Sequence, residues 1–565
     1  MLNLVLILSP TEPFLTFREA SAHLEKQYPG TFNLELFSTK ELDEDEERYK
    51  LCVEKTEKAD FVLINIFGSL SFFKSFHTYY NQFKGKKRFY IDTTIEEEVA
   101  ELFPQCQIMK EDFNTIFKYY KSGGKENSVN LIKWIGSQFA HTDIAYNPPI
   151  LPRWNGIYDP DEVISDEQEY LARIRKTDLP VIGILINVAL INDNDLIHID
   201  SLIHTIRNFG ACPLCVYTEM IPNEELGCDG VRATLEKYML YDDKPIIGSL
   251  INTVAHSVSI VASPGNGSKP QENSIFEIFD VPVFQVMSTM QSYEEWNNSV
   301  KGIDSLSLSW SVFQPEFDGQ IITYPFATTE WKETPFGSKK YYAPIYDRIE
   351  AIVSLAKNWA ILRKKDNSQK KIAVILHNNP PKNDNIGGAA GLDTPASVYR
   401  LIEDMQKNGI KTAYRFKDGK DIIDKITSGL TNDGRWSSPE SMLEKSIDTV
   451  SKEQYQVWYD EFIPRVQENL EKYWGKPVGD FMAVEDKLLI PGIINGNVFI
   501  GLQPPRAFEE KAEEMYHSTD IPCPHQYLGF YNWVEEIFKA DVIVHVGTHG
   551  TVEWLPGKEV GLSKD

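Results

Sequence analysis

The stretch "VIVHVGTHGTVEWLPGKEVGLS", residues 542–563, joins a strand pattern to a group of polar side chains. Four of its first five residues are β-branched, which favours a strand. Gly547 and Gly550 disfavour the helix that would place His545, His549 and Glu553 on one face. A buried strand followed by a glycine turn is typical of open parallel sheets, whose ligand sites lie at the carboxyl ends of the strands. The stretch therefore predicts an α/β fold with a site after its strand.

The same alternation of short apolar runs and amphipathic stretches extends over most of the chain. The strand candidates lie at 2–8, 33–38, 59–68, 87–94, 179–190, 257–263, 281–287, 370–378 and 541–546. Buried strands that alternate with helical patterns predict parallel sheets joined by crossover helices. We therefore expect a multidomain α/β protein built from several flavodoxin-like or Rossmann-like units.

The length of 565 residues is enough for about three to four domains, each with its own core. Residues 142–160 hold four prolines and little periodicity, which indicates a linker. We predict an N-terminal α/β domain over 1–141 and a linker or wrapping segment over 142–178. A second α/β domain is expected over 179–365, and a third over 366–565.

Composition excludes some classes of function. The formal net charge of −25 repels phosphate backbones, so we expect no nucleic-acid partner. No run approaches the ~18 apolar residues of a membrane span, and the N-terminus has no basic leader. Six cysteines with a single C-x-x-C, at Cys212 and Cys215, fit a reducing compartment and a structural role. We expect a cytoplasmic protein.

A second polar group follows the strand candidate at 370–378. His377 lies at the end of that run, and the glycine-rich loop "NPPKNDNIGGAAGLDTP" leads to a predicted helix with Thr394 as its N-cap. Asp393 fits either a capping group or a site residue. The loop matches neither a Walker motif nor G-x-G-x-x-G, so it does not support nucleotide binding.

The residue types after the last strand indicate metal or proton chemistry. Imidazoles and a carboxylate suit Co²⁺, Ni²⁺, Fe²⁺ or Zn²⁺. The zincin order H-E-x-x-H is absent, which disfavours a metalloprotease. The alternative is one capping histidine and one solvent-exposed histidine beside a surface glutamate, and the motif alone does not decide between the two.

Four long stretches in fixed order resemble the large subunit of class I metal chelatases, the family of the cobaltochelatase large subunit and the magnesium chelatase H subunit. They are "PEFDGQIITYPFATTE" (315–330), "AVILHNNPPKNDNIGGAAGLDTPASVYRLIEDM" (373–405), "IPGIINGNVFIGLQPPR" (490–506) and "VHVGTHGTVEWLPGKEVGLS" (544–563). The resemblance is dense from about residue 310, weaker over 180–310 and only general before 150. The cobaltochelatase branch is the more similar.

The resemblance implies insertion of a divalent metal into a tetrapyrrole of cobalamin-type or related biosynthesis. Co²⁺ is the first expectation, and Mg²⁺ and Ni²⁺ stay open as alternatives. It implies ATP hydrolysis on AAA+ partner subunits, since this chain has no Walker loop. Family members continue past the "GLS" at 561–563. We therefore expect an N-terminal fragment or a split half that pairs with the C-terminal half of the same subunit.

The resemblance also suggests roles for individual residues. Glu553 is the expected base for the pyrrole protons or the group that delivers the metal, with Trp554 desolvating it and raising its pKa. His549, His545 and His377 are the expected transient metal ligands, together with Glu553. The expected substrate contacts are Trp554, Lys558, Arg506, Asn497, Gln503 and Asp393, although Lys558 and Arg506 also fit plain surface charge. Two alternative functions stay open. A non-enzymatic tetrapyrrole carrier or sensor is indicated by the aromatic run Tyr527, Phe530, Tyr531 and Trp533, which a helix core explains as simply. A dechelatase that removes metal from a haem-like ring would use the same ligands and base.

Overall fold

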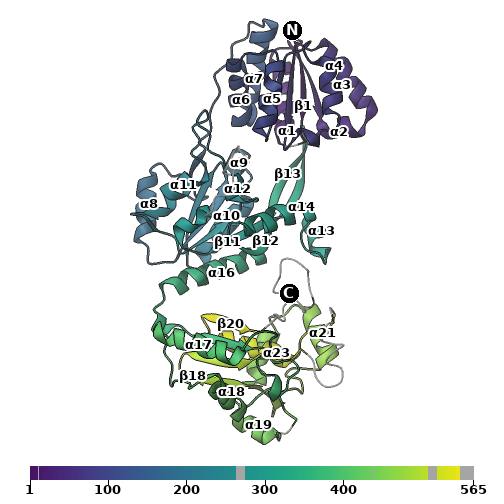
Figure 1. Cartoon of the computed structure of the whole chain (residues 1–565). Coiled ribbons are helices and arrows are strands. Elements are labelled where there is room, and N and C mark those ends of the chain that lie inside the picture. Colours follow the sequence, from purple (N-terminus) through teal and green to yellow (C-terminus); the bar gives the residue numbers. More distant parts are fainter. Residues whose placement is uncertain are drawn as a thin grey trace. The chain divides into compact units, whose positions relative to one another are not determined.

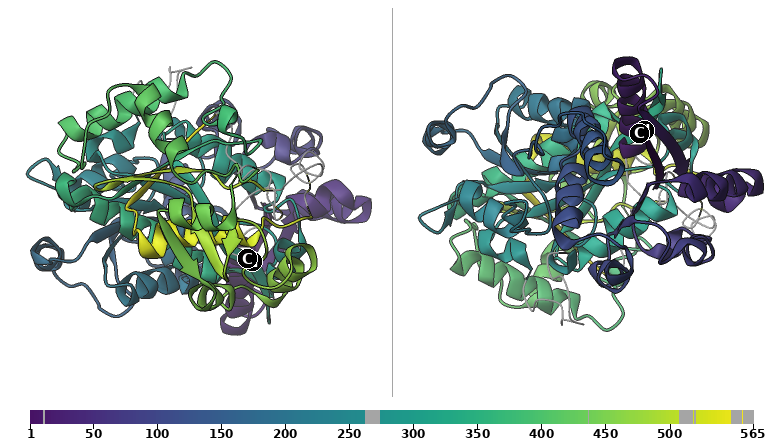
Figure 2. Two further views of the ribbon diagram at one scale, coloured as in Figure 1. Left: turned by 90° about the horizontal axis from the view of Figure 1, so that it is seen from below. Right: turned by 90° about the horizontal axis from the view of Figure 1, so that it is seen from above.

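The computed structural model describes residues 1–10, 12–261, 274–435, 437–506, 518, 520–547 and 556. Its contacts divide the chain into two compact units, Met1–Ser299 with Ile303–Lys357 and Val300–Gly302 with Asn358–Asp565. Figures 1 and 2 trace both units by colour along the chain. The predicted multidomain α/β class is confirmed. The predicted division into four segments stays a prediction.

The first sheet of unit 1 has four parallel strands in the order β2-β1-β3-β4. Their bounds are β1 (Leu2–Leu8), β2 (Phe32–Ser38), β3 (Phe61–Ile66) and β4 (Phe89–Thr93). The helices between and after them are α1 (Glu12–Gln27), α2 (Thr39–Glu44), α3 (Glu46–Lys58), α4 (Phe76–Phe83), α5 (Glu96–Leu102), α6 (Lys110–Ser122) and α7 (Gly124–Ala140). Alternate strand residues enter separate apolar clusters on the two faces, because a parallel sheet is covered on both sides.

The second sheet of unit 1 has seven strands in the order β13-β12-β11-β10-β6-β7-β5. They are β5 (Asn155–Tyr158), β6 (Val181–Asn187), β7 (Cys212–Thr218), β10 (Ser249–Asn252), β11 (Val283–Ser288), β12 (Ile321–Thr334) and β13 (Gly337–Pro344). The inner five are parallel, while β5 and β13 pair antiparallel at the two edges. The expected linker 142–178 therefore contains an edge strand of this sheet.

The helices of this region are α8 (Glu167–Lys176), α9 (Val188–Asn192), α10 (Ile197–Asn208), α11 (Gly230–Met239), α12 (Val258–Val261), α13 (Tyr293–Asn298), α14 (Ser305–Leu308), α15 (Gln314–Glu316) and α16 (Tyr346–Lys364). A two-stranded ribbon joins β8 (Leu240–Tyr241) to β9 (Lys244–Pro245). In the described ranges, no helix combines the length and the apolar character that crossing a bilayer requires.

The strand expected over 257–263 is wrong, because Val258–Val261 form the short helix α12. Asp318 accepts hydrogen bonds from the backbone N–H of Val258 at 2.7 Å, from the backbone N–H of Ser259 at 3.3 Å and from the Ser257 hydroxyl at 2.9 Å. These bonds satisfy donors at the start of a helix, which N-terminal helical N–H groups require. A carboxylate about sixty residues further along the chain thus selects a helix over a strand in an apolar run.

The main sheet of unit 2 has the order β18-β19-β14-β20. Its strands are β14 (Ile372–Leu376), β18 (Gly492–Asn495), β19 (Val498–Leu502) and β20 (Val542–Val546). The last three in this order are parallel, with Leu376 in register with Leu502 on one side and Val546 on the other. Strand β18 is antiparallel to β19. The carboxyl ends of β19, β14 and β20 therefore meet at one edge of the sheet.

Helices cover both faces of this sheet (Figure 1). One face packs against α17 (Thr394–Lys407) and α18 (Gly419–Ser428), and the other against α20 (Lys452–Tyr459), α21 (Pro464–Trp474) and α23 (His525–Asn532). A small antiparallel sheet, β15-β17-β16, is formed by Asp448–Ser451, Lys487–Ile490 and Ala483–Val484, beside α19 (Pro439–Lys445). The expected N-cap Thr394 is the first residue of α17, and Asp393 caps the helix instead, because its carboxylate accepts from the Ala396 N–H at 3.1 Å.

Candidate functional site

His545 lies in β20, one residue before the carboxyl end of this edge strand. Its Nε2 is hydrogen-bonded to the hydroxyl of Tyr531 at 2.8 Å, and the two rings lie 5.8 Å apart between centroids. Desolvation lowers the pKa of His545, which keeps the ring neutral at neutral pH. A neutral imidazole is the form that binds a metal or accepts a proton.

Tyr531 anchors His545 from the helical segment that precedes β20. Burial raises the pKa of the Tyr531 phenol, and its side-chain hydrogen bond with Gln503 offsets this only in part. The Tyr531 ring also packs against Tyr527 at 5.1 Å between centroids. Tyr531 therefore stays a protonated phenol that fixes the position of the His545 ring.

Gln503 follows β19 at the same edge and is 6% exposed. Its backbone N–H donates to the carbonyl of Leu376 at 2.9 Å, which extends the ladder between β19 and β14 by one bond. Its own carbonyl accepts from the Asn432 side chain at 2.9 Å. Gln503 therefore lies at the edge of the sheet that carries His377 and His545, and its expected contact with the tetrapyrrole stays a prediction.

His377 follows β14 at the centre of the edge. Its backbone N–H donates to the Val546 carbonyl at 3.0 Å, and its carbonyl accepts from the Gly387 N–H at 2.7 Å. The Nδ1 atom is buried and has no hydrogen-bond partner among the described residues. A Cβ on Gly547 would lie 2.8 Å from the Cβ of His377, so glycine lets β20 pass this close. His377 and His545 thus lie on neighbouring strands at one edge.

Other expected substrate contacts lie elsewhere or have other partners. Arg506 is 3% exposed and donates to the Ser518 carbonyl at 3.4 Å, so it is not a surface charge. Asp393 is exposed and uses one carboxylate oxygen to cap α17. Asn497 lies in the turn between β18 and β19, at the amino end of β19, and donates to the Ser368 carbonyl at 3.1 Å. The structure therefore does not bring Asn497 to the edge that carries the histidines.

His549, Glu553, Trp554 and Lys558 lie outside the described residues. Within the described ranges, no group of three or more His, Cys, Asp or Glu side chains is arranged to hold a metal ion. The described edge thus contributes imidazoles that can act as ligands, and the expected contributions of His549 and Glu553 stay predictions.

Sequence reasoning missed two groups at this edge. In the sequence Tyr531 belongs only to an aromatic run, whereas in the structure its hydroxyl holds His545. Asn432, from the segment after α18, donates to the side chain of Asn378 at 3.2 Å and joins it to Gln503. No spacing signal in the sequence links residues so far apart along the chain.

Comparison with known proteins identifies the class. A family model described as CobN/Magnesium Chelatase matches residues 117–565, about four fifths of the chain. This chain therefore belongs to the CobN/magnesium chelatase family, and the resemblance found in its motifs is confirmed.

Individual relatives support this membership. An uncharacterised protein of Methanocaldococcus jannaschii is 38% identical over 483 residues, covering 84% of this chain and 38% of the relative. The aerobic cobaltochelatase subunit CobN of Pseudomonas aeruginosa is 27% identical over 469 residues, covering 82% of this chain and 36% of the relative. The solved catalytic subunit of cobaltochelatase from Mycobacterium tuberculosis has the same fold, with a TM-score of 0.64 at 22% identity over 99% of this chain and 44% of that one. The chain spans less than half the length of each of these three proteins.

Proposed function

We propose that this chain provides the tetrapyrrole-binding and metal-handling surface of a chelatase large subunit that inserts Co²⁺ into a cobalamin-type ring. The observation that carries the proposal is the family match over residues 117–565, which includes both histidine-bearing strand ends of unit 2. ATP hydrolysis on AAA+ partner subunits drives the insertion.

The chemistry needs a transient metal ligand and a proton acceptor above the ring. His545 suits the first task, because its lowered pKa favours the neutral ring and Tyr531 fixes the position of that ring. His377 is a second ligand one strand away, and His549 completes the set. Glu553 accepts the two pyrrole protons one after the other and releases each to solvent, as a positioned carboxylate can when its pKa is raised by apolar surroundings. Arg506, Lys558, Gln503 and Trp554 hold the ring and its acidic side groups.

Co²⁺ is preferred over Mg²⁺ because imidazole nitrogen is a better ligand for Co²⁺, whereas Mg²⁺ prefers oxygen. The alternative of a passive carrier relied on the aromatic residues of 527–533. Phe530 and Trp533 are buried in the core of unit 2, so packing already accounts for them. Dechelation would use the same groups in the reverse reaction, and the spectral titration described next distinguishes it from insertion.

The test is a spectral titration of the chain with free-base and metallated tetrapyrroles, followed by Co²⁺ or Mg²⁺ in the presence of the ATPase subunits and ATP. We expect binding of the free-base ring and Co²⁺ insertion only with partners and ATP. Insertion should be lost in Glu553→Ala and reduced in His545→Gln. His23→Gln, at an exposed histidine of α1, serves as the matched control. Tight ring binding without transfer would establish a carrier, and loss of metal from a metallated ring would establish a dechelatase.

A further inference from the structure

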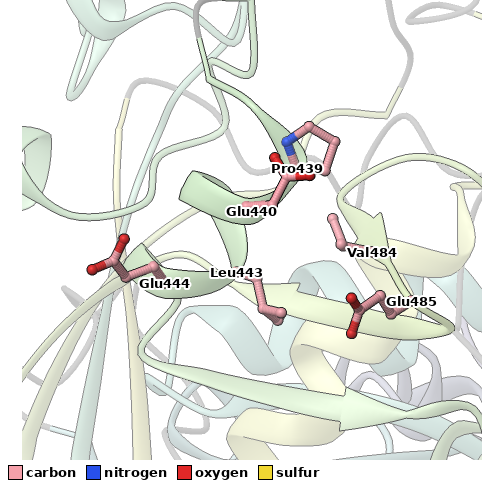
Figure 3. Close-up of a pocket in the computed structure, with 6 residues that line it drawn as sticks. All are labelled: Pro439, Glu440, Leu443, Glu444, Val484 and Glu485. Carbon is pink, nitrogen blue, oxygen red and sulfur yellow. The ribbon is translucent and has the colours of Figure 1, made fainter.

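Polar groups of unit 2 gather at two places besides the histidines, and the two places differ in exposure. One is a pocket of about 350 Å³ between α19 and the turn that joins β16 to β17 (Figure 3). Its glutamates Glu440, Glu444 and Glu485 are exposed, and Glu444 points away from the other two. Solvent therefore satisfies these carboxylates. The other place is the start of α23, where polar groups are buried without described partners.

The start of α23 lies over the carboxyl end of β19. Trp533 packs on Phe499 at 5.0 Å between ring centroids, and a Cβ on Gly501 would lie 2.9 Å from the Phe530 ring. The helix therefore runs towards the carboxyl end of the strand as its residue numbers fall. Gln526 precedes Phe530 by one turn, about 5.4 Å, which is close to the advance of two residues along a strand. Gln526 thus lies at the same edge of the sheet as the histidines.

Two backbone N–H groups at this helix start are buried without a described acceptor. The N-cap residue is Pro524, which provides no side-chain cap. The N–H groups of Tyr527 and Leu528 donate to the Pro524 carbonyl at 3.0 and 3.3 Å, whereas those of His525 and Gln526 have no acceptor among the described residues. His525 and Gln526 are only 1% and 2% exposed. A buried helix start of this kind is costly unless another molecule supplies the acceptors.

The Gln526 side chain is a second, independent sign of a missing partner. Its Oε1 and Nε2 atoms are both buried and have no hydrogen-bond partner among the described residues. Long side chains in helices point back towards the N-terminus, so this amide lies over the helix start. Native proteins leave few buried amides unbonded, because desolvation without a hydrogen bond is costly. The amide and the two N–H groups therefore indicate one binding site.

The backbone of this helix start is fixed by the His525 ring. Its Nε2 donates to the Gly475 carbonyl at 2.9 Å, and its Nδ1 accepts from the Tyr455 hydroxyl at 2.9 Å. Since both ring nitrogens are occupied, the ring holds the first turn in place. The N–H donors are therefore oriented before a ligand arrives, which lowers the cost of binding.

The charges near the helix start favour an anion. The first turn of a helix carries the positive end of its dipole, which attracts carboxylates and phosphates. Burial raises the pKa of the Cys523 thiol to about 12, and the guanidinium of Arg506, itself 3% exposed, offsets only part of this rise. Arg506 therefore lies near the residues that lead into α23. The carboxylate that acts on the His525 ring, Glu471, accepts from the Tyr459 hydroxyl at 3.3 Å.

We propose that the start of α23 is a subsite for a carboxylate group of the tetrapyrrole. The backbone N–H groups of His525 and Gln526 and the Gln526 Nε2 donate to the carboxylate, and Arg506 provides the positive charge. A water molecule that donates to both the carboxylate and the Gln526 Oε1 satisfies the remaining acceptor. This subsite rests on the proposed function, because it places one side group of a ring that lies against the histidine edge.

The first test compares stability after replacement of Gln526 by methionine, which has a similar length and no amide. Because the Gln526 amide has no described partner, Gln526→Met should leave the Tm of the full chain unchanged or raise it. The matched control is Gln467→Met in α21, where the Gln467 Nε2 donates to the Tyr459 carbonyl at 2.9 Å, and it should lower the Tm. An equal fall in both variants would assign Gln526 a structural hydrogen bond and overturn the proposal.

The second test is a spectral titration of the full chain with free-base deuteroporphyrin, whose side groups include carboxylates, and with its dimethyl ester in the same neutral detergent. In Gln526→Met we expect the Kd of the carboxylate ring to rise about tenfold, since a hydrogen bond to a charged group is lost. The Kd of the ester should rise less than about twofold, and Gln467→Met should change neither. An equal rise for both rings, or an unchanged Kd for the carboxylate ring, would overturn the proposal.

A probe without a ring separates this subsite from the proposed function. At constant ionic strength, succinate should raise the Tm of the unaltered chain and of Gln467→Met by about 1–2 °C. In Gln526→Met the rise should be less than half as large. If neither porphyrin binds the unaltered chain, the proposed ring binding fails, and the succinate result still decides the subsite. No rise in the unaltered chain, or an equal rise in Gln526→Met, would overturn the subsite.

Discussion

His198 is a buried histidine of unit 1, and its burial makes the stability of this unit depend on pH. It lies in α10, is 1% exposed and packs against the rings of Phe326 and Tyr342, at 5.4 and 5.2 Å between centroids. Burial lowers its pKa to about 3. We predict that replacement of His198 by phenylalanine removes a pH-dependent loss of stability from unit 1.

The direction and the size of this pH effect on the free energy of unfolding follow from the difference in proton binding between the unfolded and the folded chain. In the unfolded chain a histidine has a pKa of about 6.5, so below that pH the unfolded state binds a proton that the folded state excludes. The contribution of neutral His198 to stability is therefore complete above pH 6.5 and falls as the pH drops towards 3. Between pH 7 and pH 5 the loss is about 2 kcal/mol, at ~1.4 kcal/mol for each pH unit below 6.5.

The assay is urea unfolding at pH 7 and pH 5, followed by hydrogen exchange of the α10 amides so that unit 1 is observed alone. Phenylalanine fills the same apolar space, so His198→Phe should lose about 2 kcal/mol less than the unaltered protein between the two pH values. The control His23→Gln changes an exposed histidine and should leave this difference unchanged. Equal pH dependence in His198→Phe and in the unaltered chain would refute the reasoning.

Three further substitutions test other parts of the structure. Asp318→Ala leaves the buried N–H groups of Val258 and Ser259 without their acceptor. We expect the free energy of unfolding of unit 1 to fall by about 2–3 kcal/mol. A fall of less than about 0.5 kcal/mol would contradict the capping role of Asp318. Gly419→Ala places a Cβ 2.5 Å from the carbonyl carbon of Pro395 and should destabilise unit 2 by about 1–3 kcal/mol in urea unfolding. Gly434→Ala, whose Cβ would have its nearest neighbour in the Met442 side chain at 3.7 Å, is the control and should cost less. Gly547→Ala would place a Cβ 2.8 Å from the His377 Cβ and displace that side chain. We expect weaker tetrapyrrole binding in a spectral titration, with unchanged unfolding of unit 1. Unaltered binding would show that His377 does not contact the ring.

The strands of both units were largely predictable, because strands buried on both faces of a parallel sheet appear as continuous apolar runs. The runs at 2–8 and 370–378 contain β1 and β14, and 541–546 contains β20. The run at 257–263 has the same character and forms a helix, because Asp318 supplies its N-terminal acceptor. A pattern read along the chain cannot include a partner that arrives from a distant segment.

The sequence also predicted that His377 and His545 lie at the carboxyl ends of neighbouring strands, but it did not predict the hydrogen bonds around them. Strands β14 and β20 are parallel and in register, so His377 and His545 had to meet near one edge once both were placed at strand ends. The direction of β19 decided the outcome for two other residues. Gln503 follows this strand and reaches the edge, whereas Asn497 precedes it and lies at the opposite end. The bond from Tyr531 to His545 depends on how the preceding helical segment packs on the sheet, which spacing does not encode.

The environments of the two imidazoles bear on how such an edge can handle a metal as substrate. A structural zinc site closes four ligands around its ion, which holds the metal permanently. The edge described for this chain has two imidazoles in different settings: His545 is exposed and tied to Tyr531, and His377 has a buried Nδ1 with no described partner. If these two imidazoles bind the metal as proposed, they leave its other coordination positions open, which allows the ion to be handed on. We infer that this edge suits transfer better than storage, and that the strength of binding is set by the ligands that His549 and Glu553 would add.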